Sequence, residues 1–345
     1  MKAIQQEKVK TYLLRLIKGG RKDYVKAAVE SFGISKSTVY NYVKQMEADG
    51  LIEKRGNAYV LHTNKYQYFF KNDGSLGEDR VYAQCIAQHI QFKKNVNSIW
   101  NYAFTEMMNN AIEHSQADNI AVGIDQNCLE TQILIVDDGI GIFKKIQGFM
   151  KESKNETVSL KECVSLLFAG KFTTAKQLHT GEGIFFTSHI MDEFVIYSDD
   201  NVFTRNNFSS AQIEDPNLHS FMQMETGTVV RMTLSNQSKK VLSEVFNTFA
   251  PVEEGFVKTA IPVAHMFAGS GPVSRSEARR LLECIALFTD IDLDFSGVEE
   301  IGQGFAHELF VVGKQKYPHI HLKTANTCKA VEDMIRRVIK TSTLS

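Results

Sequence analysis

The sequence lacks the features that place a protein outside the reducing cytoplasm. Its five cysteines are scattered and form no Cys-x-x-Cys pair, which argues against a disulfide framework and against a cysteine-built zinc site. No run approaches the roughly 18 consecutive apolar residues that a membrane-spanning helix needs. The first residues are polar and charged, without the apolar core of a signal peptide. We therefore expect a cytoplasmic protein.

The chain also lacks an overall charge of one sign. The formal net charge is −1 over 345 residues, so the whole molecule has no field that attracts nucleic acid. The charge is unevenly placed, however. Residues 1–65 hold 13 Lys and Arg against 6 Asp and Glu, and the remaining 280 residues balance to −8. With 43% hydrophobic and 23% charged residues, this length predicts two or three globular domains, of which the first is basic.

The basic segment, residues 1–62, has the pattern of three short helices followed by a hairpin. Apolar residues recur at helical spacing, and Ser35 is placed to cap a third helix that ends at Gly50. Two short strands then flank the turn Arg55-Gly-Asn. This order, with its junction Glu47-Ala-Asp-Gly-Leu-Ile-Glu-Lys, resembles the winged helix-turn-helix of many bacterial transcription regulators.

The exposed face of that third helix carries short polar, aromatic and cationic side chains. These suit a DNA major groove, where hydroxyls and amides reach base edges and lysines meet phosphates. Together with Arg55 at the tip of the hairpin, the candidate DNA-binding residues are Lys36, Ser37, Thr38, Tyr40, Asn41 and Lys44. Double-stranded DNA is therefore the expected partner. The alternative is a winged helix that docks on a protein, because a local charge of +7 is a weak footprint by itself.

The rest of the chain has a mixed α/β pattern. The polar residues around Asn72-Asp-Gly indicate a linker, and the Lys-rich residues 143–180 are typical of a mobile lid. We expect helices near 81–94 and 96–114, and strands near 120–124, 132–136, 194–197 and 228–234. The expected domains are the winged helix-turn-helix at 1–62, a linker at 63–80, an α/β domain at 81–235, a connector at 236–255 and a last α/β domain at 256–345.

Nucleotide motifs of the phosphate-loop type are missing, since no Gly-x-x-x-x-Gly-Lys-[Ser/Thr] occurs. Instead, the helical segment 104–115 places Glu106, Asn110 and Glu113 on one face. A carboxylate and an amide oxygen one turn apart can hold a water and Mg²⁺, which prefers oxygen ligands. Taken alone, such a face is more often the solvated side of an amphipathic helix.

Two further motifs follow along the chain. Asp137 ends an apolar strand, and Gly139 and Gly141 let the backbone approach a flat ligand. The carboxylate can then accept a hydrogen bond from an adenine amine, although Asp-x-Gly-x-Gly alone is equally a tight turn or a calcium loop. Gly181 and Gly183 next open a helix whose free N–H groups can hold phosphates.

In this order, the three motifs resemble the N box and glycine boxes of the GHKL (histidine-kinase-like) ATPases, a superfamily that includes DNA gyrase and anti-sigma-factor kinases. The resemblance covers 81–235 and implies an α/β sandwich, with a mixed sheet layered on helices, that binds ATP and Mg²⁺. The roles that it implies are Asn110 for Mg²⁺, Glu106 as general base, Asp137 for adenine, Gly139 and Gly141 for the pocket, Thr180, Gly181 and Gly183 for the phosphates, Thr228 beside the adenine, and Lys171 from the lid. The sequence departs from the family at Asp138, where Asn is common, and in its short Gly-Glu-Gly run.

The histidines give little support to phosphoacceptor or metal chemistry. His89 lacks the acidic neighbour and the Arg-Thr-Pro run of the histidine-kinase box, and His114 is more typical of a structural histidine. His319 and His321 share a face of an expected strand, but no third ligand is evident, so a metal site is not expected.

The C-terminal residues 273–306 resemble a STAS-like domain of unassigned role, a small α/β domain. In anti-sigma-factor antagonists of this layout, a phosphorylated serine stands at the start of a helix. Gln303 and Gly304 hold that place here and cannot accept a phosphate, so we expect docking or sensing through this helix. Ser296 is interpreted as a cap at the end of a strand.

The leading hypothesis is a bacterial transcription regulator whose DNA-binding domain is switched by ATP·Mg in the central domain, with a homodimer and a protein partner for the STAS-like domain as further expectations. One alternative is a serine/threonine protein kinase of the anti-sigma type. Another is an ATP-dependent scaffold whose winged helix binds protein. The motifs do not separate slow hydrolysis from pure ATP sensing.

Overall fold

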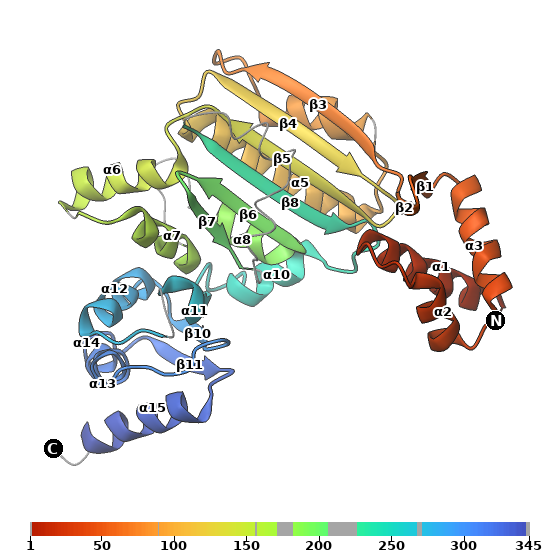
Figure 1. Ribbon diagram of the computed structural model, residues 1–345. Coiled ribbons are helices and arrows are strands. Elements are labelled where there is room, and N and C mark those ends of the chain that lie inside the picture. Colours follow the sequence, from red (N-terminus) through yellow and green to blue (C-terminus); the bar gives the residue numbers. More distant parts are fainter. Residues whose placement is uncertain are drawn as a thin grey trace.

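The computed structural model describes residues 2–88, 90–155, 157–170, 182–205, 226–267 and 271–342. It is a mixed α/β structure with three separate sheets, one of two strands, one of six and one of three. Figure 1 shows the N-terminal helices at one end of the six-stranded sheet and the C-terminal elements below α7 and α10, on the side of β6 and β7.

The N-terminal region contains the three helices and the hairpin that the sequence predicts. Ser35 begins the third helix, because its hydroxyl accepts a hydrogen bond from the Thr38 amide at 3.1 Å. The apolar stripes of the helices enclose Leu13, Val39 and Met46. The elements are α1 (Lys2–Lys18), α2 (Tyr24–Phe32), α3 (Lys36–Ala48), and the antiparallel strands β1 (Ile52–Arg55) and β2 (Ala58–Leu61).

The central sheet has the strand order β3-β4-β5-β8-β6-β7, and its pairs are all antiparallel. The mixed sheet expected from the family resemblance is therefore wrong for these strands. The strands are β3 (Asn64–Lys71), β4 (Asn119–Gln126), β5 (Glu130–Asp137), β6 (Glu193–Ser198), β7 (Asn201–Thr204) and β8 (Thr228–Ser235).

Residues 63–80 are not a linker, contrary to the sequence-based expectation. They contain β3, which pairs with β4 along its whole length. Tyr66, Tyr68 and Phe70 point to the core at a period of two residues, which is the spacing of a half-buried edge strand. The polar residues between them hide this signal in the sequence.

One face of the sheet is covered by helices whose side chains form the central core (Figure 1). Trp100 and Phe104 are fully buried there. The covering elements are α4 (Glu78–Tyr82), the π-helical turn η1 (Ala83–Ala87), α5 (Lys94–Asn109), the π-helical turn η2 (Asn110–His114), α8 (Gly183–Ile190) and α10 (Leu242–Phe249).

Much of the expected lid is helical. α6 (Ile142–Lys154) buries Phe143 and Met150, and α7 (Leu160–Ala169) begins with a capping box between Ser159 and Glu162. Lysines on the exposed side of α6 stand between the apolar residues that recur at helical spacing. The apolar pattern of this segment therefore looks irregular in the sequence. Residues 171–180 of the expected lid lie outside the described residues.

The C-terminal region is built on a parallel sheet of order β11-β10-β9. Its core includes Ile291, Leu293 and Phe305. The elements are β9 (Lys258–Pro262), α11 (Val263–Met266), α12 (Arg275–Ile285), β10 (Asp290–Asp294), α13 (Gln303–His307), the π-helical turn η4 (Glu308–Val312), α14 (Gly313–Lys316), β11 (His321–Ala325) and α15 (Lys329–Ser342). None of the helices described here or above is both long and apolar enough to cross a membrane.

Candidate functional site

Two of the three motifs meet where the end of α5 lies against the start of α8. A Cβ atom added to Gly183 would lie 2.1 Å from Glu106 Oε2, so the carboxylate occupies space that only a glycine leaves open. Tyr102, one turn before Glu106, is enclosed beside them. Burial and the negative charges of Glu106 and Glu182 raise the pKa of the Tyr102 hydroxyl. Glu106 and Gly183 are 77 positions apart in the sequence, and the fold brings them into contact.

Asn110 lies one turn after Glu106, at the start of η2. Its side chain is half-buried, and within the described ranges its amide has no hydrogen-bond partner. Glu113, the third residue of the expected face, is exposed. Of the expected face, Glu106 is the residue that lies against Gly183.

Asp137 stands at the end of β5 and is only 5% exposed. Its Oδ1 accepts a hydrogen bond from the Gly139 amide at 3.0 Å, and Thr228 lies opposite it in the register with β8. Burial raises the pKa of the Asp137 carboxyl to about 6, while hydrogen bonds from Gly139 and Thr228 oppose the rise. A carboxylate in this environment gains from any donor that a ligand supplies.

The glycines after Asp137 are required by close approaches of the backbone. A Cβ on Gly139 would lie 2.1 Å from the carbonyl oxygen of Ser115, the residue that follows the first motif. Gly141 has φ of +86°, and a Cβ there would lie 2.5 Å from Asp199 Oδ2. The second motif is therefore packed directly on the first motif and on the turn after β6.

Thr228 joins this strand end to α6. Thr228 is buried, and its hydroxyl accepts a hydrogen bond from the Ile142 amide at 3.1 Å. Lys144, in the first turn of α6, forms an ion pair with Asp199 at 2.5 Å, and Lys145 donates to the carbonyl of His114. Burial lowers the pKa of the Lys145 amine.

Asp138 has a local role. Its carboxylate accepts hydrogen bonds from the backbone and side-chain nitrogens of Asn119, at 2.9 and 2.7 Å. Partial burial raises its pKa, but these hydrogen bonds outweigh burial and hold the pKa below its usual range. Asp138 thereby holds the end of β5 to the start of β4.

Some site residues lie outside the described residues, and others have no sequence signal. Lys171, Thr180 and Gly181 belong to the first group, as does His89. The contacts of Ser198 and Asp199 with Gly141, and the ring of Tyr102 beside Glu106, belong to the second, because they depend on long-range packing.

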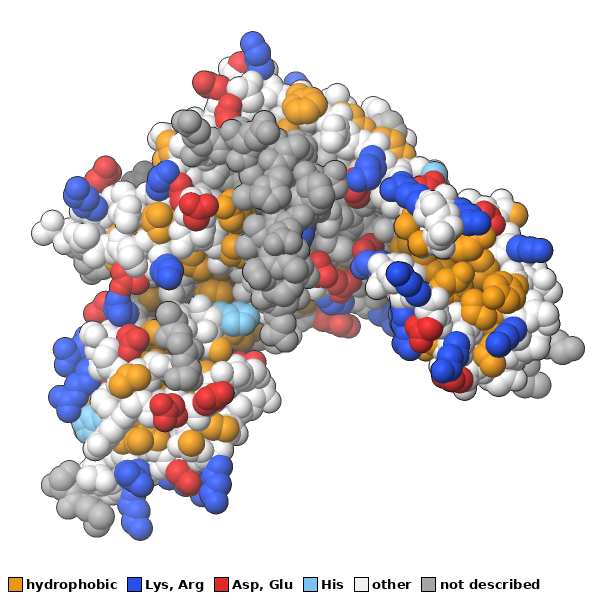
Figure 2. Space-filling model, in the orientation of Figure 1, with side chains coloured by type: hydrophobic (Ala, Val, Ile, Leu, Met, Phe, Trp, Pro, Cys, Tyr) orange, Lys and Arg blue, Asp and Glu red, His pale blue; other side chains and the backbone are white. Residues whose placement is uncertain are grey.

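The candidate DNA-binding residues of α3 lie on its surface. Lys36, Ser37, Tyr40, Asn41 and Lys44 are exposed. Figure 2 shows Lys and Arg side chains around the N-terminal helices, where they rim an apolar surface.

Three of the predicted DNA contacts already bind other side chains of the protein, and the Ser37 hydroxyl, 2.7 Å from that of Ser35, is the first of them. Thr38 is half-buried, and its hydroxyl lies 2.9 Å from the Ser35 hydroxyl. Arg55 pairs with Glu53 at 2.7 Å, and that carboxylate also meets His62 at 3.2 Å. Unlike Arg55, the exposed Lys36 and Lys44 form no ion pair with the described part of the chain.

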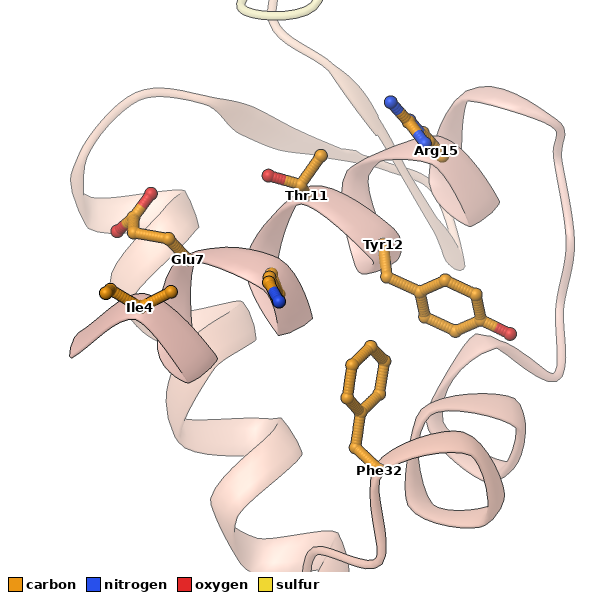
Figure 3. Close-up of a pocket in the computed structure, with 7 residues that line it drawn as sticks. Ile4, Glu7, Thr11, Tyr12, Arg15 and Phe32 are labelled. Atoms are coloured by element: carbon orange, nitrogen blue, oxygen red, sulfur yellow. The ribbon is translucent and has the colours of Figure 1, made fainter. Parts of the chain in front are cut away.

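An open groove of about 620 Å³ lies on α1 and α2, away from the motifs (Figure 3). The rings of Tyr12 and Phe32 meet edge to face in it, with centroids 5.3 Å apart. The groove contains none of the residues expected to bind nucleotide or DNA.

The C-terminal candidates behave as ordinary structural residues. Ser296 donates to Asp294 Oδ1 at 2.7 Å, so it is a cap at the end of β10, as expected. His319 Nε2 lies 3.1 Å from the Ala286 carbonyl oxygen. Across the described ranges, no group of three His, Cys, Asp or Glu side chains is placed to hold a metal ion.

A comparison with protein families gave a match in this region. Residues 277–332 match the model of a STAS-like domain of unknown function (DUF4325). The matched segment runs from α12 through β10, α13 and β11 into α15, so the STAS-like interpretation of the C-terminal part is confirmed. A comparison with curated proteins gave no match.

Proposed function

We propose that the protein is an ATP-binding regulator, in which a central domain of the GHKL type binds Mg·ATP and a winged helix-turn-helix binds double-stranded DNA. The observation that carries this proposal is the contact between Glu106 and Gly183. It joins the motif expected to hold Mg²⁺ to the motif expected to hold phosphates, across a long sequence separation.

The residues present fit the nucleotide. The support comes from Asp137, a buried acceptor at a strand end, and from the glycines that let Ser115, Asp199 and Glu106 pack closely around it and around Gly183. Asp137 would accept from the exocyclic amine of adenine, with Thr228 beside it. Asn110 would ligate Mg²⁺, whose charge would neutralise that of the phosphates. Lys171, Thr180 and Gly181 remain predicted phosphate contacts.

Glu106 is the candidate general base. Its carboxylate lies at the start of α8, where the free amide groups of a helix N-terminus would face a bound phosphate. From there it can polarise a water for hydrolysis or a hydroxyl for phosphoryl transfer. The same geometry therefore serves a slow ATPase and a kinase, and the fate of the γ-phosphate distinguishes them.

The test separates binding from turnover. We expect Glu106→Gln to bind Mg·ATP within about threefold of the wild type and to lose turnover by at least about 100-fold, the usual contribution of a general base. Asn110→Asp should instead weaken binding itself. A Glu106→Gln protein that hydrolyses ATP at the wild-type rate would show that another group acts as the base.

A further inference from the structure

The helix at the nucleotide motif is shared between two cores. α8 begins at Gly183, against Glu106, and its first turn also places Phe185 and Phe186 in the C-terminal core, where both are fully buried. Their ring centroids lie 4.7 and 5.1 Å from that of Phe256, which precedes β9. A displacement of the C-terminal region must therefore move α8 or open a cavity beside it.

Arg205, directly after β7, donates hydrogen bonds to three elements, α7, α8 and β9. Its Nε donates to Ser188 Oγ at 3.0 Å, one Nη to the Ala260 carbonyl at 2.9 Å, and the other to the Phe168 carbonyl at 2.8 Å. The guanidinium also lies over the rings of Phe168 and Phe185, 5.4 and 5.0 Å from their centroids. Burial lowers its pKa to about 9, so the group stays cationic at neutral pH.

These three partners come from different parts of the fold. Ser188 is on α8, Phe168 is on α7, and Ala260 is on β9 of the C-terminal sheet. The planar fork of Arg205 satisfies all three at once, which no other side chain can do with the same geometry. The neighbouring His189 stays neutral, because burial and the charge of Arg205 lower its pKa to about 3.

A second connection runs over the surface from α7 to the C-terminal region. Arg280 on α12 forms an ion pair with Glu162 on α7, and Ser165 on α7 donates to the Met266 carbonyl at 3.1 Å. Next to Arg280, Arg279 pairs with Glu308 at 2.7 Å, entirely within the C-terminal region. Arg280 thus links the C-terminal region to α7, whereas the adjacent Arg279 makes its ion pair within the C-terminal region.

From these contacts we infer that the C-terminal STAS-like module is a positioning part of the nucleotide site, with Arg205 as the positioning residue that holds α8, and hence Gly183, against Glu106. The inference rests on the proposed function. Coupling between two sites is reciprocal. A partner that draws the module away from α7 and α8 therefore weakens Mg·ATP binding, and Mg·ATP weakens the binding of that partner to the same extent.

The test uses four full-length proteins: the wild type, Arg205→Lys, Arg280→Gln and Arg279→Gln. Mg·ATP affinity is measured by calorimetry. Arg280→Gln loses a partly exposed ion pair between the regions, so its affinity should fall about two- to fivefold. Arg205→Lys keeps the charge but loses the fork, so its affinity should fall about tenfold or more. Arg279→Gln is the matched control and should bind like the wild type.

Hydrogen exchange of the α8 amides gives a readout that needs no nucleotide. We expect faster exchange in Arg205→Lys and Arg280→Gln and wild-type exchange in Arg279→Gln. Wild-type exchange in the first two variants would overturn the inference, as would faster exchange with unchanged Mg·ATP affinity. A wild-type protein that binds no Mg·ATP would refute the proposed function instead, while the exchange data would still decide whether the module holds α8.

Discussion

Asp137 gives a quantitative test of the site that does not require a ligand. Its pKa rises from an ordinary 3.8 to about 6 on folding, mainly because the carboxyl is buried. Between these two values the folded protein keeps a proton that the unfolded chain has lost. The free energy of unfolding must therefore fall as pH rises through this window, and the penalty is complete above about pH 6. A shift of about two units corresponds to ~3 kcal/mol.

Asp137→Asn removes this titration while its amide oxygen can still accept from the Gly139 amide. Trp100, the single tryptophan, is fully buried in the central core, so its fluorescence reports unfolding of this domain. Urea unfolding of both proteins between pH 4 and 7 should show the wild type losing ~3 kcal/mol relative to Asp137→Asn. Titrating groups that do not interact with Asp137 cancel in this difference, and only the neighbouring Asp138 contributes to the pKa of Asp137 through its charge. Parallel pH profiles would refute the assignment of a raised pKa to Asp137.

The remaining predictions concern the close approach at the second motif and the proposed DNA-binding helix α3. Gly139→Ala places a Cβ against the Ser115 carbonyl and should destabilise the central domain by about 3 kcal/mol in urea unfolding. Gly148→Ala, in the open on α6, should instead be neutral or stabilise by up to about 1 kcal/mol, and equal effects would contradict the packing argument. Replacing Lys36 and Lys44 by Gln should lower the salt slope of duplex binding by about 2, since two phosphate contacts are lost. An unchanged slope in a protein that binds duplex would place DNA on another surface.

Local sequence signals predicted the elements around the site because they depend on near neighbours. Ser35 and Gly50 mark the ends of α3, and Asp137 marks the end of β5, each through a cap or a change of pattern within a few residues. The same holds for the C-terminal strand that ends before Ser296.

The features that were missed depend on pairing over long distances. The polar residues of β3 are exposed at a sheet edge and resemble a linker in the sequence, and only the pairing with β4 identifies this segment as a strand. The antiparallel order of the sheet is likewise a property of pairing. Arg205 has no motif at all, since its three acceptors are carbonyl and hydroxyl oxygens from separate elements.

The most direct test of the central claim is a calorimetric titration of the full-length protein with Mg·ATP, alongside Asp137→Asn. We predict that the wild type binds and that the substitution weakens binding by at least about tenfold. The buried carboxylate only accepts hydrogen bonds, whereas the Asn amide can also present a donor to the adenine amine. Absence of binding by the wild type, or equal binding by both proteins, would contradict the assignment of a nucleotide site to Asp137 and its glycines.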